Sequence, residues 1–411
     1  MARKPPSPPL GPLDGLRVID LTQMLAGPYC TMLLADQGAE VVKVEPLDGD
    51  GTRLMGPHRV DDRLKLFGGY FQSVNRNKLS IAIDLKQAEG RALLMRLVDT
   101  AAVLVENYRA GVMDRLGLAY ETLRVQNRKL VYASIRGFGD PRTGKSPYVE
   151  WPAYDVVAQA MGGIMGITGP NAETPIKVGP GVGDLVPAVM AAFGIMAAVY
   201  RAEKTGEGQY VDVGMVDAVL SLCERIVHQF FYQENVPGPE GNRHPFLSPF
   251  GIVPAKDGYV ALACHADEFW AELCRLMGRE ELASDPRYAT RQARAEHQDL
   301  VYAAVGDFTR RHTKHDLMGI LGGHVPFGPV FDVSDIVADP HFKVRQMIVP
   351  LEHPGSPTKV AVAGIPIRMT ETPGSIRRRA PLLGEDTDAV LGMIGMKPAE
   401  VARLREHKIV K

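Results

Sequence analysis

One aspartate in the sequence stands where a carboxylate can react with a bound ligand. Asp184 ends the segment Gly179-Pro180-Gly181-Val182-Gly183-Asp184, and a long helical pattern rich in small residues runs from Leu185 to Arg201. The glycines leave space for a thioester beside a carboxylate at a helix N-terminus. Because aspartate ordinarily titrates near pH ~4, this carboxylate needs no general base to act as a nucleophile at neutral pH. On these residues alone a structural role is favoured, since Asp is a preferred N-cap and Pro187 suits a first turn, and the two roles do not exclude each other.

Other catalytic patterns are weak or missing. No G-x-S-x-G or H-E-x-x-H motif occurs. Glu45 follows the second apolar run, which is where a dinucleotide-binding protein places its ribose ligand. However, the loop from Leu21 to Pro28 holds only Gly27, and Pro28 begins the helix, so its amides cannot cradle a pyrophosphate in the usual way. A nucleotide-binding, dehydrogenase-like protein therefore remains only a distant alternative.

Composition narrows the class of protein. The chain has 411 residues, 45% hydrophobic and 23% charged, with a formal net charge of −1. No basic excess exists to neutralise a nucleic-acid backbone, so no nucleic-acid partner is expected.

The four cysteines form no C-x-x-C pair, which predicts buried reduced thiols, no disulfide and no metal site. The N-terminus lacks a long apolar region, and the longest apolar stretch, from Leu185 to Tyr200, is shorter than a membrane span. We expect a cytoplasmic protein without a membrane partner.

Apolar runs alternate with helical patterns through the first half of the chain. The runs lie at residues 16–21, 41–44, 80–85, 103–106, 130–135 and 210–213, and helical spacing separates several of them. This alternation predicts an α/β fold with an open, doubly wound, Rossmann-like parallel sheet. Ligands of such sheets bind at the carboxyl ends of strands. The loops at residues 22–28, 107–110 and 136–154 are therefore expected to form the site.

The character of the sequence changes after about Cys223. A Pro/Gly-rich loop at residues 235–249 is followed by a short strand pattern and helical segments, which predict a smaller α+β domain. We expect residues 1–222 to form the first part of a large domain, 223–330 the small domain, and 331–411 a segment that returns to the large one.

Several short motifs together carry a resemblance to a known family. They are Asp20-Leu21-Thr22 with Ala26-Gly27-Pro28, Gly38–Glu45, Asn75–Ile81, Val105–Arg109, Gly183-Asp184 and Lys204–Gln209. In order and spacing the chain resembles the class III CoA-transferases (CaiB/BaiF type), the group of formyl-CoA transferase and carnitine CoA-transferase, over nearly its whole length. The resemblance implies a homodimer of interlocked rings, acyl-CoA and small carboxylic acid substrates, and no permanently bound cofactor.

The resemblance also implies roles for individual residues. Asp184 matches the family's catalytic aspartate. Coenzyme A contacts map to Leu25, Ala26, Ile83, Asp84, Leu85, Lys86, Asn107, Tyr108, Arg109 and Arg115, and the pantetheine arm to Ala153, Tyr154 and Asp155. Pro46 departs from relatives that have an arginine there, so a phosphate contact must be replaced or lost. Arg53 and Arg76 are the candidates to replace it, with a solvated surface role equally open for either.

The implied reaction moves CoA from an acyl-CoA donor, with succinyl-CoA as the leading expectation, to a carboxylic and preferably dicarboxylic acid. The intermediates would be an aspartyl anhydride and an aspartyl-CoA thioester. Racemases of the same fold, of the α-methylacyl-CoA type, use a histidine where this chain has Tyr154. A tyrosine with an ordinary pKa of about 10 is a poor base for an α-proton, so the racemase or isomerase is the second choice.

Overall fold

Six parallel strands form the central sheet of the computed structural model, which describes residues 11–411. The strand order is β3-β2-β1-β4-β5-β6, which is the order of the dinucleotide-binding doubly wound folds. All five neighbouring pairs are parallel. The strands are β1 (Arg17–Asp20), β2 (Glu40–Glu45), β3 (Lys78–Ala82), β4 (Val103–Glu106), β5 (Val131–Arg136) and β6 (Tyr210–Gly214). The α/β class and the parallel sheet are confirmed.

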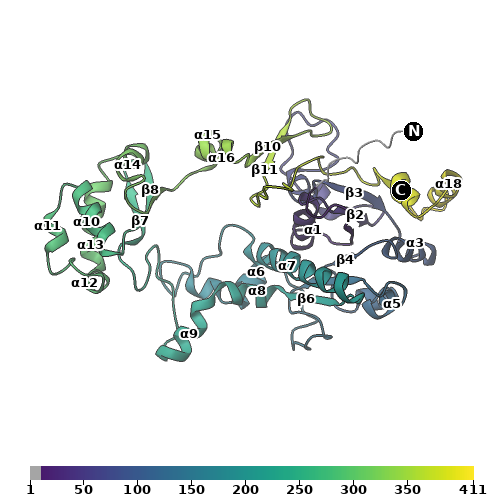
Figure 1. Cartoon of the computed structure of the whole chain (residues 1–411), viewed down its shortest axis with the longest axis horizontal. Coiled ribbons are helices and arrows are strands. Elements are labelled where there is room, and N and C mark those ends of the chain that lie inside the picture. The colour runs from purple at the N-terminus through teal and green to yellow at the C-terminus, as the bar shows by residue number, and fades with distance from the viewer. Residues whose placement is uncertain (1–10) are drawn as a thin grey trace. The chain divides into compact units, whose positions relative to one another are not determined.

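Helices cover both faces of this sheet (Figure 1). One face packs against α1 (Ala26–Asp36) and α7 (Val182–Thr205). On the other face, strand residues such as Ile19, Val42 and Leu104 share a buried core with α3 (Ala88–Val98), α5 (Tyr120–Gln126), α17 (Thr387–Met393) and α18 (Pro398–Glu406). Strands that are buried on both faces have continuous apolar sequences, which is why the apolar runs predicted their positions.

Two elements between β2 and β3 were not expected. They are the 3-10 helix η1 (Gly51–Leu54) and α2 (Gly69–Asn75). Phe67 and Phe71 pack together with Ala380 in a small buried cluster. The apolar spacing of Phe67, Phe71 and Val74 is that of a helix face and would have revealed α2.

The helix α7 contains 24 residues and ends at Gly206, whose φ of 76° is left-handed. A glycine in the left-handed conformation is the usual way for a helix to end. Among residues 11–411, α7 is the one helix long and apolar enough to cross a membrane, with a third of its most apolar window buried. The expectation that this stretch is too short to span was therefore wrong about its length. One side of α7 packs against α1, β5 and β6, while apolar side chains such as Phe193 stay exposed on another side.

The chain divides into two compact units. The first contains residues up to 164, 178–228 and 340–411, and the second contains 165–177 and 229–339. Besides the elements above, the first unit holds α4 (Val112–Arg115), α6 (Asp155–Met161), α8 (Met215–Leu222), α16 (Pro340–Val344) and the antiparallel pair β10 (Ile348–Leu351) and β11 (Val360–Ala363). Between residues 164 and 178 lies the 3-10 helix η2 (Ile164–Ile167), and α9 (Glu224–Gln233) crosses residue 228.

The second unit is built on a three-stranded antiparallel sheet. Its strands are β7 (Phe250–Ala255), β8 (Gly258–Ala263) and β9 (Phe327–Pro329). Its helices are α10 (Asp267–Leu276), α11 (Glu281–Ser284), α12 (Arg291–Glu296), α13 (Gln298–Thr309), α14 (Lys314–Leu321) and α15 (Val333–Ala338). Trp270, Leu273 and Val301 are central to its own buried core, as an α+β unit requires.

Two smaller expectations concern the cysteines and the chain start. All four cysteines are buried and free, as predicted. The expectation about the absence of a signal peptide falls mainly on residues 1–10, which lie outside the described part of the chain.

Candidate active site

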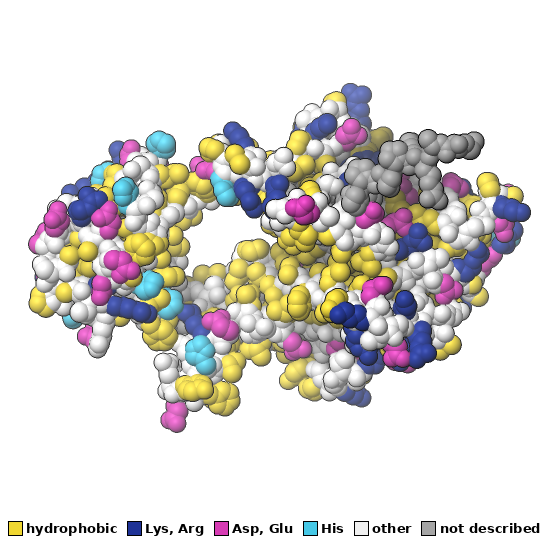
Figure 2. Space-filling view, viewed as in Figure 1, with side chains coloured by type: hydrophobic (Ala, Val, Ile, Leu, Met, Phe, Trp, Pro, Cys, Tyr) yellow, Lys and Arg dark blue, Asp and Glu magenta, His cyan; other side chains and the backbone are white. Residues whose placement is uncertain are grey.

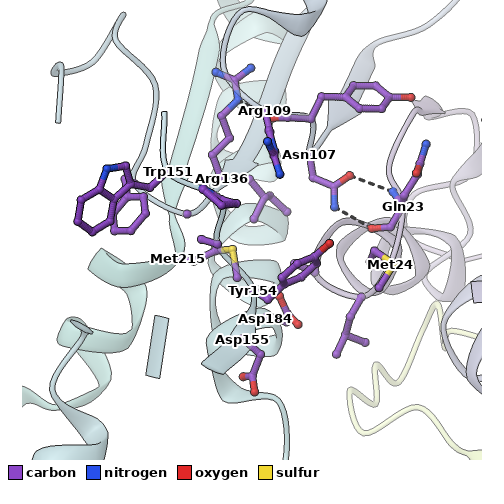
Figure 3. Close-up of a pocket in the computed structure, with 18 of the residues that line it drawn as sticks. Gln23, Met24, Asn107, Arg109, Arg136, Trp151, Tyr154, Asp155, Asp184 and Met215 are labelled. Atoms are coloured by element: carbon purple, nitrogen blue, oxygen red, sulfur yellow. Dashed lines mark hydrogen bonds between the residues drawn. The ribbon is translucent and has the colours of Figure 1, made fainter. Parts of the chain in front are cut away.

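A cavity of about 380 Å³ opens at the carboxyl ends of the strands in the first unit. Figure 3 shows its lining side chains, which come from the loops after β1, β4 and β5 together with the start of α7. These are the loops expected to form the site. The lining residues are Gln23–Ala26, Tyr70, Asn107–Ala110, Ile135–Phe138, Val149, Trp151–Asp155, Asp184 and Met215. A cavity of this size is in the usual range for a small-molecule site.

Two buried lysines donate hydrogen bonds to the backbone of the loop after β1. The Lys43 Nζ donates a hydrogen bond to the Thr22 carbonyl at 2.8 Å, and the Lys78 Nζ donates to the Pro28 carbonyl at 2.9 Å. Lys78 also pairs with Asp20 at 3.0 Å, and Asp20 accepts from the Thr22 amide at 2.9 Å. Because both ends of the loop are fixed, its cavity face is ordered before any ligand binds.

Asn107 joins the loops after β1 and β4. Its side-chain Oδ1 accepts from the Gln23 amide at 2.9 Å, and its Nδ2 donates to the Gln23 carbonyl at 2.7 Å (Figure 3, dashed lines). The next residue, Met24, has a φ of 68°, which an L-residue adopts only when its surroundings enforce it. The structure therefore gives Asn107 a bridging role in addition to its place on the cavity wall.

Arg136 is a buried cation of the wall. Its guanidinium pairs with Glu106 and Asp140, and its Nε donates to the Tyr108 carbonyl at 3.1 Å. Burial raises the pKa of Glu106 to about 7, although Arg136 works in the opposite direction. Arg109 is exposed and lines the same cavity. A ligand phosphate would therefore meet Arg109 rather than Arg136, whose charge is already matched by carboxylates.

Asp184 lies inside the first turn of α7. The helix begins at Val182 with Gly181 as its N-cap residue, and no side chain caps it. The N-cap interpretation of Asp184 is therefore wrong, and the carboxylate is left to face the cavity beside Tyr154 (Figure 3). Burial, and then the neighbouring charge of Asp155, raise the pKa of Asp184 to about 7. The expectation of an ordinary carboxyl pKa was wrong, because desolvation could not be read from the sequence.

Tyr70 is a cavity residue that the sequence interpretation missed. It stands on α2, the helix that was not expected, and its exposed face lines the cavity. Burial, followed by the charges of Asp184, Asp50 and Asp155, raises the pKa of Tyr70 to about 12. A tyrosine with a raised pKa stays protonated at neutral pH, so the Tyr70 hydroxyl is a hydrogen-bond donor on the cavity wall.

Some of the expected site residues lie elsewhere. The expected residues that line the cavity with Asp184 are Leu25, Ala26, Asn107, Tyr108, Arg109, Ala153, Tyr154 and Asp155. The four residues after β3 do not line the cavity; they are Ile83, Asp84, Leu85 and Lys86. Arg115 lines a neighbouring cavity of about 600 Å³, which shares Ala110 with the first.

The two arginines offered as substitutes at Pro46 are already paired. Arg53 binds Glu45 with 2.7 Å from its Nη2 to Oε1, and Arg76 binds Asp36 with 2.7 Å from its Nη2 to Oδ2. Both arginines are buried, and neither lines the cavity. A solvated surface role is therefore wrong for both. Their guanidinium groups stabilise the connections around β2 and β3.

The raised pKa of Asp184 predicts a pH dependence. A nucleophilic carboxylate must be ionised, and a raised pKa means that the ionised fraction grows as the pH rises through about 7. We expect kcat/KM to fall about tenfold between pH 8 and pH 6. Replacing Asp155 with Asn removes the second cause of the shift and should move the midpoint to lower pH. A wild-type profile that stays flat down to pH 5 would show that Asp184 titrates normally.

Comparisons with known proteins identify the family of this chain. The sequence profile described as CoA-transferase family III matches residues 13–387. The chain belongs to CoA-transferase family III. A succinyl-CoA:mesaconate CoA-transferase of Haloarcula hispanica is 48% identical over 387 residues, 94% of this chain and 97% of its own length. A succinate–glutarate CoA-transferase of Agrobacterium fabrum is 39% identical and covers 92% of this chain and 95% of its own.

A solved structure supports the fold of this family III CoA-transferase. A CaiB/BaiF family protein from Brucella suis has a TM-score of 0.83 and 35% identity, and the match covers 93% of this chain and 99% of that one. The family predicted from short motifs is confirmed, and the protein is an enzyme. The dehydrogenase-like alternative is left without support, even though the strand order is that of dinucleotide-binding proteins.

Proposed function

We propose that this enzyme transfers CoA from succinyl-CoA to a small dicarboxylic acid, with mesaconate as the first acceptor to test. The observation that carries the proposal is a carboxylate at a helix N-terminus, Asp184, facing a cavity built from the loops after three parallel strands. The named activities of the relatives from Haloarcula and Agrobacterium support succinyl-CoA as the donor.

The reaction would use the Asp184 carboxylate as a nucleophile. One of its oxygens attacks the thioester carbonyl of the donor, forming an aspartyl–acyl anhydride and releasing the CoA thiolate. The thiolate attacks the aspartyl carbonyl, forming an aspartyl-CoA thioester and releasing the donor acid. The acceptor carboxylate then attacks that thioester, forming a second anhydride between the acceptor and Asp184 and releasing the CoA thiolate. The thiolate attacks the acceptor's carbonyl in this anhydride. The products are the acceptor's CoA thioester and free Asp184.

The surroundings of Asp184 suit this sequence of steps. The N-terminus of α7 favours the anion, whereas burial and Asp155 disfavour it. A carboxylate with a raised pKa is a stronger nucleophile than an ordinary one once it is ionised. Each attack places charge on a carbonyl oxygen, and we propose the protonated Tyr70 as a donor to that oxygen.

Coenzyme A is proposed to lie along the cavity wall. The loop residues Leu25, Ala26, Asn107, Tyr108 and Arg109 would contact the nucleotide side. Ala153, Tyr154 and Asp155 would lie along the pantetheine arm, which ends at Asp184. Arg115 and the residues 83–86 lie outside this cavity, so the proposal needs the nucleotide to extend beyond it.

We also propose that the enzyme is a homodimer. Hydrophobic side chains gather on the surface over α7 and α8 (Figure 2), where Val189, Phe193 and Leu220 are 51%, 78% and 43% exposed. Exposed apolar patches of this kind commonly mark protein interfaces. Analytical ultracentrifugation of the purified chain measures the state directly.

The substrate assignment is tested by product analysis. Succinyl-CoA and acetyl-CoA would each be incubated with mesaconate, itaconate, citramalate, malate, glutarate and oxalate, and the acyl-CoA products identified by mass spectrometry. We expect succinyl-CoA and mesaconate to give mesaconyl-CoA at the highest kcat/KM. A complete lack of new acyl-CoA with every pair would contradict the proposal. Exchange of an α-deuterium from an acyl-CoA without any acceptor would instead identify a racemase.

A further inference from the structure

Gln159 is a fully buried glutamine that does not line the cavity. It stands on α6, which packs against the first turns of α7. A buried side-chain amide must find hydrogen-bond partners, and the partners that it finds here all belong to the surroundings of Asp184.

The contacts of Gln159 form a clamp on the segment that precedes the nucleophile. Its Oε1 accepts from the Val178 amide at 3.0 Å. Its Nε2 lies 2.9 and 3.0 Å from the two carboxylate oxygens of Asp155, and 3.5 Å from the Pro180 carbonyl. One side chain therefore contacts this segment at two backbone positions and also fixes the rotamer of Asp155.

Asp155 passes this constraint on to the residue before the nucleophile. Its Oδ1 accepts from the amide of Gly183, the residue before Asp184, at 2.8 Å. Figure 3 shows the Asp155 carboxylate turned away from the Asn107–Gln23 side of the cavity. A Cβ at Gly183 would lie 2.5 Å from the Asp155 carbonyl oxygen and 3.0 Å from the Ala158 Cβ. The backbone at the start of α7 therefore lies in direct contact with α6, and this contact restricts the movement of Asp184.

We propose that Gln159 is a positioning residue for Asp184. It acts through Asp155 and the Val178–Gly183 backbone to hold the carboxylate at the distance from the thioester that attack requires. This inference rests on the proposed role of Asp184 as the nucleophile. A misplacement of about 1 Å can cost on the order of 100-fold in rate, so a clamp of this kind affects the chemical step more than binding.

The test is a separation of kcat from KM. Gln159→Met keeps the volume but removes the donors to Asp155 and Pro180 and the acceptor for Val178. We expect kcat to fall by about 10- to 100-fold. The KM for the acyl-CoA should change less than about threefold, because Gln159 itself does not line the cavity and Asp155 keeps its bond to the Gly183 amide. In a single turnover, the rate at which hydroxylamine-trapped product appears on Asp184 should fall by the same factor as kcat.

Thr387→Val is the matched control. Thr387 is also fully buried, and its hydroxyl on α17 donates to the carbonyls of Gly384 and Lys411 at 2.9 and 2.7 Å. This variant loses comparable hydrogen bonds away from α2, α6 and α7, so its melting temperature should fall by a similar amount while kcat stays within about twofold of wild type. Equal losses of kcat in both variants would mean that only stability was affected, and would overturn the proposal.

A second variant covers the case in which Gln159→Met does not fold. Gln159→Glu keeps the size and the acceptor for Val178 but removes the amide donor and puts a like charge beside Asp155. We expect the same loss of kcat with little change in KM. A wild-type kcat in either folded variant overturns the inference alone. Absence of any trapped product on Asp184 in the wild-type enzyme would instead overturn the proposed function.

Discussion

Asp184→Ala is expected to retain at most about 1% of wild-type CoA transfer while still binding CoA. The proposed covalent route passes through this carboxylate three times, as the donor anhydride, the CoA thioester and the acceptor anhydride, so a variant without it has no covalent bypass of comparable rate. Asp155 is the nearest acidic neighbour on the cavity wall, but it is committed to Gln159 and the Gly183 amide. The measurements are the steady-state rate with succinyl-CoA and mesaconate, and CoA affinity by calorimetry.

The control for this experiment is another aspartate in the first turn of a helix. Asp388 occupies that position on α17, where it pairs with Arg405 far from the cavity. Asp388→Ala should leave the rate within about twofold of wild type, because an exposed ion pair contributes little. Transfer by Asp184→Ala above about 1% would contradict the covalent mechanism. Loss of CoA binding in that variant would point to a collapsed cavity instead.

Lys78→Met is expected to cost about 3–5 kcal/mol of the free energy of unfolding, because it leaves Asp20 as a buried carboxylate without its nearest cation. Both side chains are completely buried, and the Lys78 ammonium also serves Pro28 and Asn75. The loop after β1 loses its anchor at the same time, so the KM for the acyl-CoA should rise. Chemical denaturation measures the first effect, and steady-state kinetics measures the second.

A surface ion pair provides the comparison. Arg128 and Glu207 pair with side chains that are 75% and 42% exposed, so Arg128→Met should cost less than about 1 kcal/mol. The double variant Lys78→Met with Asp20→Asn should be more stable than the sum of the single effects, because the unpaired charge is gone. If Lys78→Met cost no more than Arg128→Met, the buried network would not stabilise the fold.

The fold was largely readable because its strands are buried on both faces. Valine-rich runs such as Val41–Val44 and Val103–Val105 are typical of strands buried on both faces, and parallel strands place the loops that follow them at one edge of the sheet. The helix α2 was missed because it lies in a long connection whose polar and glycine residues obscure the short apolar pattern. Tyr70, which lines the same cavity as Asp184, was missed together with this helix.

The electrostatics of the site could not be read from the sequence. Asp184 looked like an ordinary carboxylate and a helix cap, and only the packing of α7 against α6 shows that it is desolvated and lies beyond the cap position. Arg53 looked like a free cation near Pro46. Its pairing with Glu45 depends on a contact between β2 and η1 that no local pattern encodes.

The most direct test of the catalytic proposal is to trap the acylated enzyme. Wild-type enzyme would be mixed with succinyl-CoA, quenched with hydroxylamine, digested and analysed by mass spectrometry. We predict a hydroxamate on the peptide that contains Asp184, formed at a rate no slower than turnover and missing when the acyl-CoA is omitted. A modification confined to any other residue, or none under conditions of active turnover, would contradict the role of Asp184 as the nucleophile.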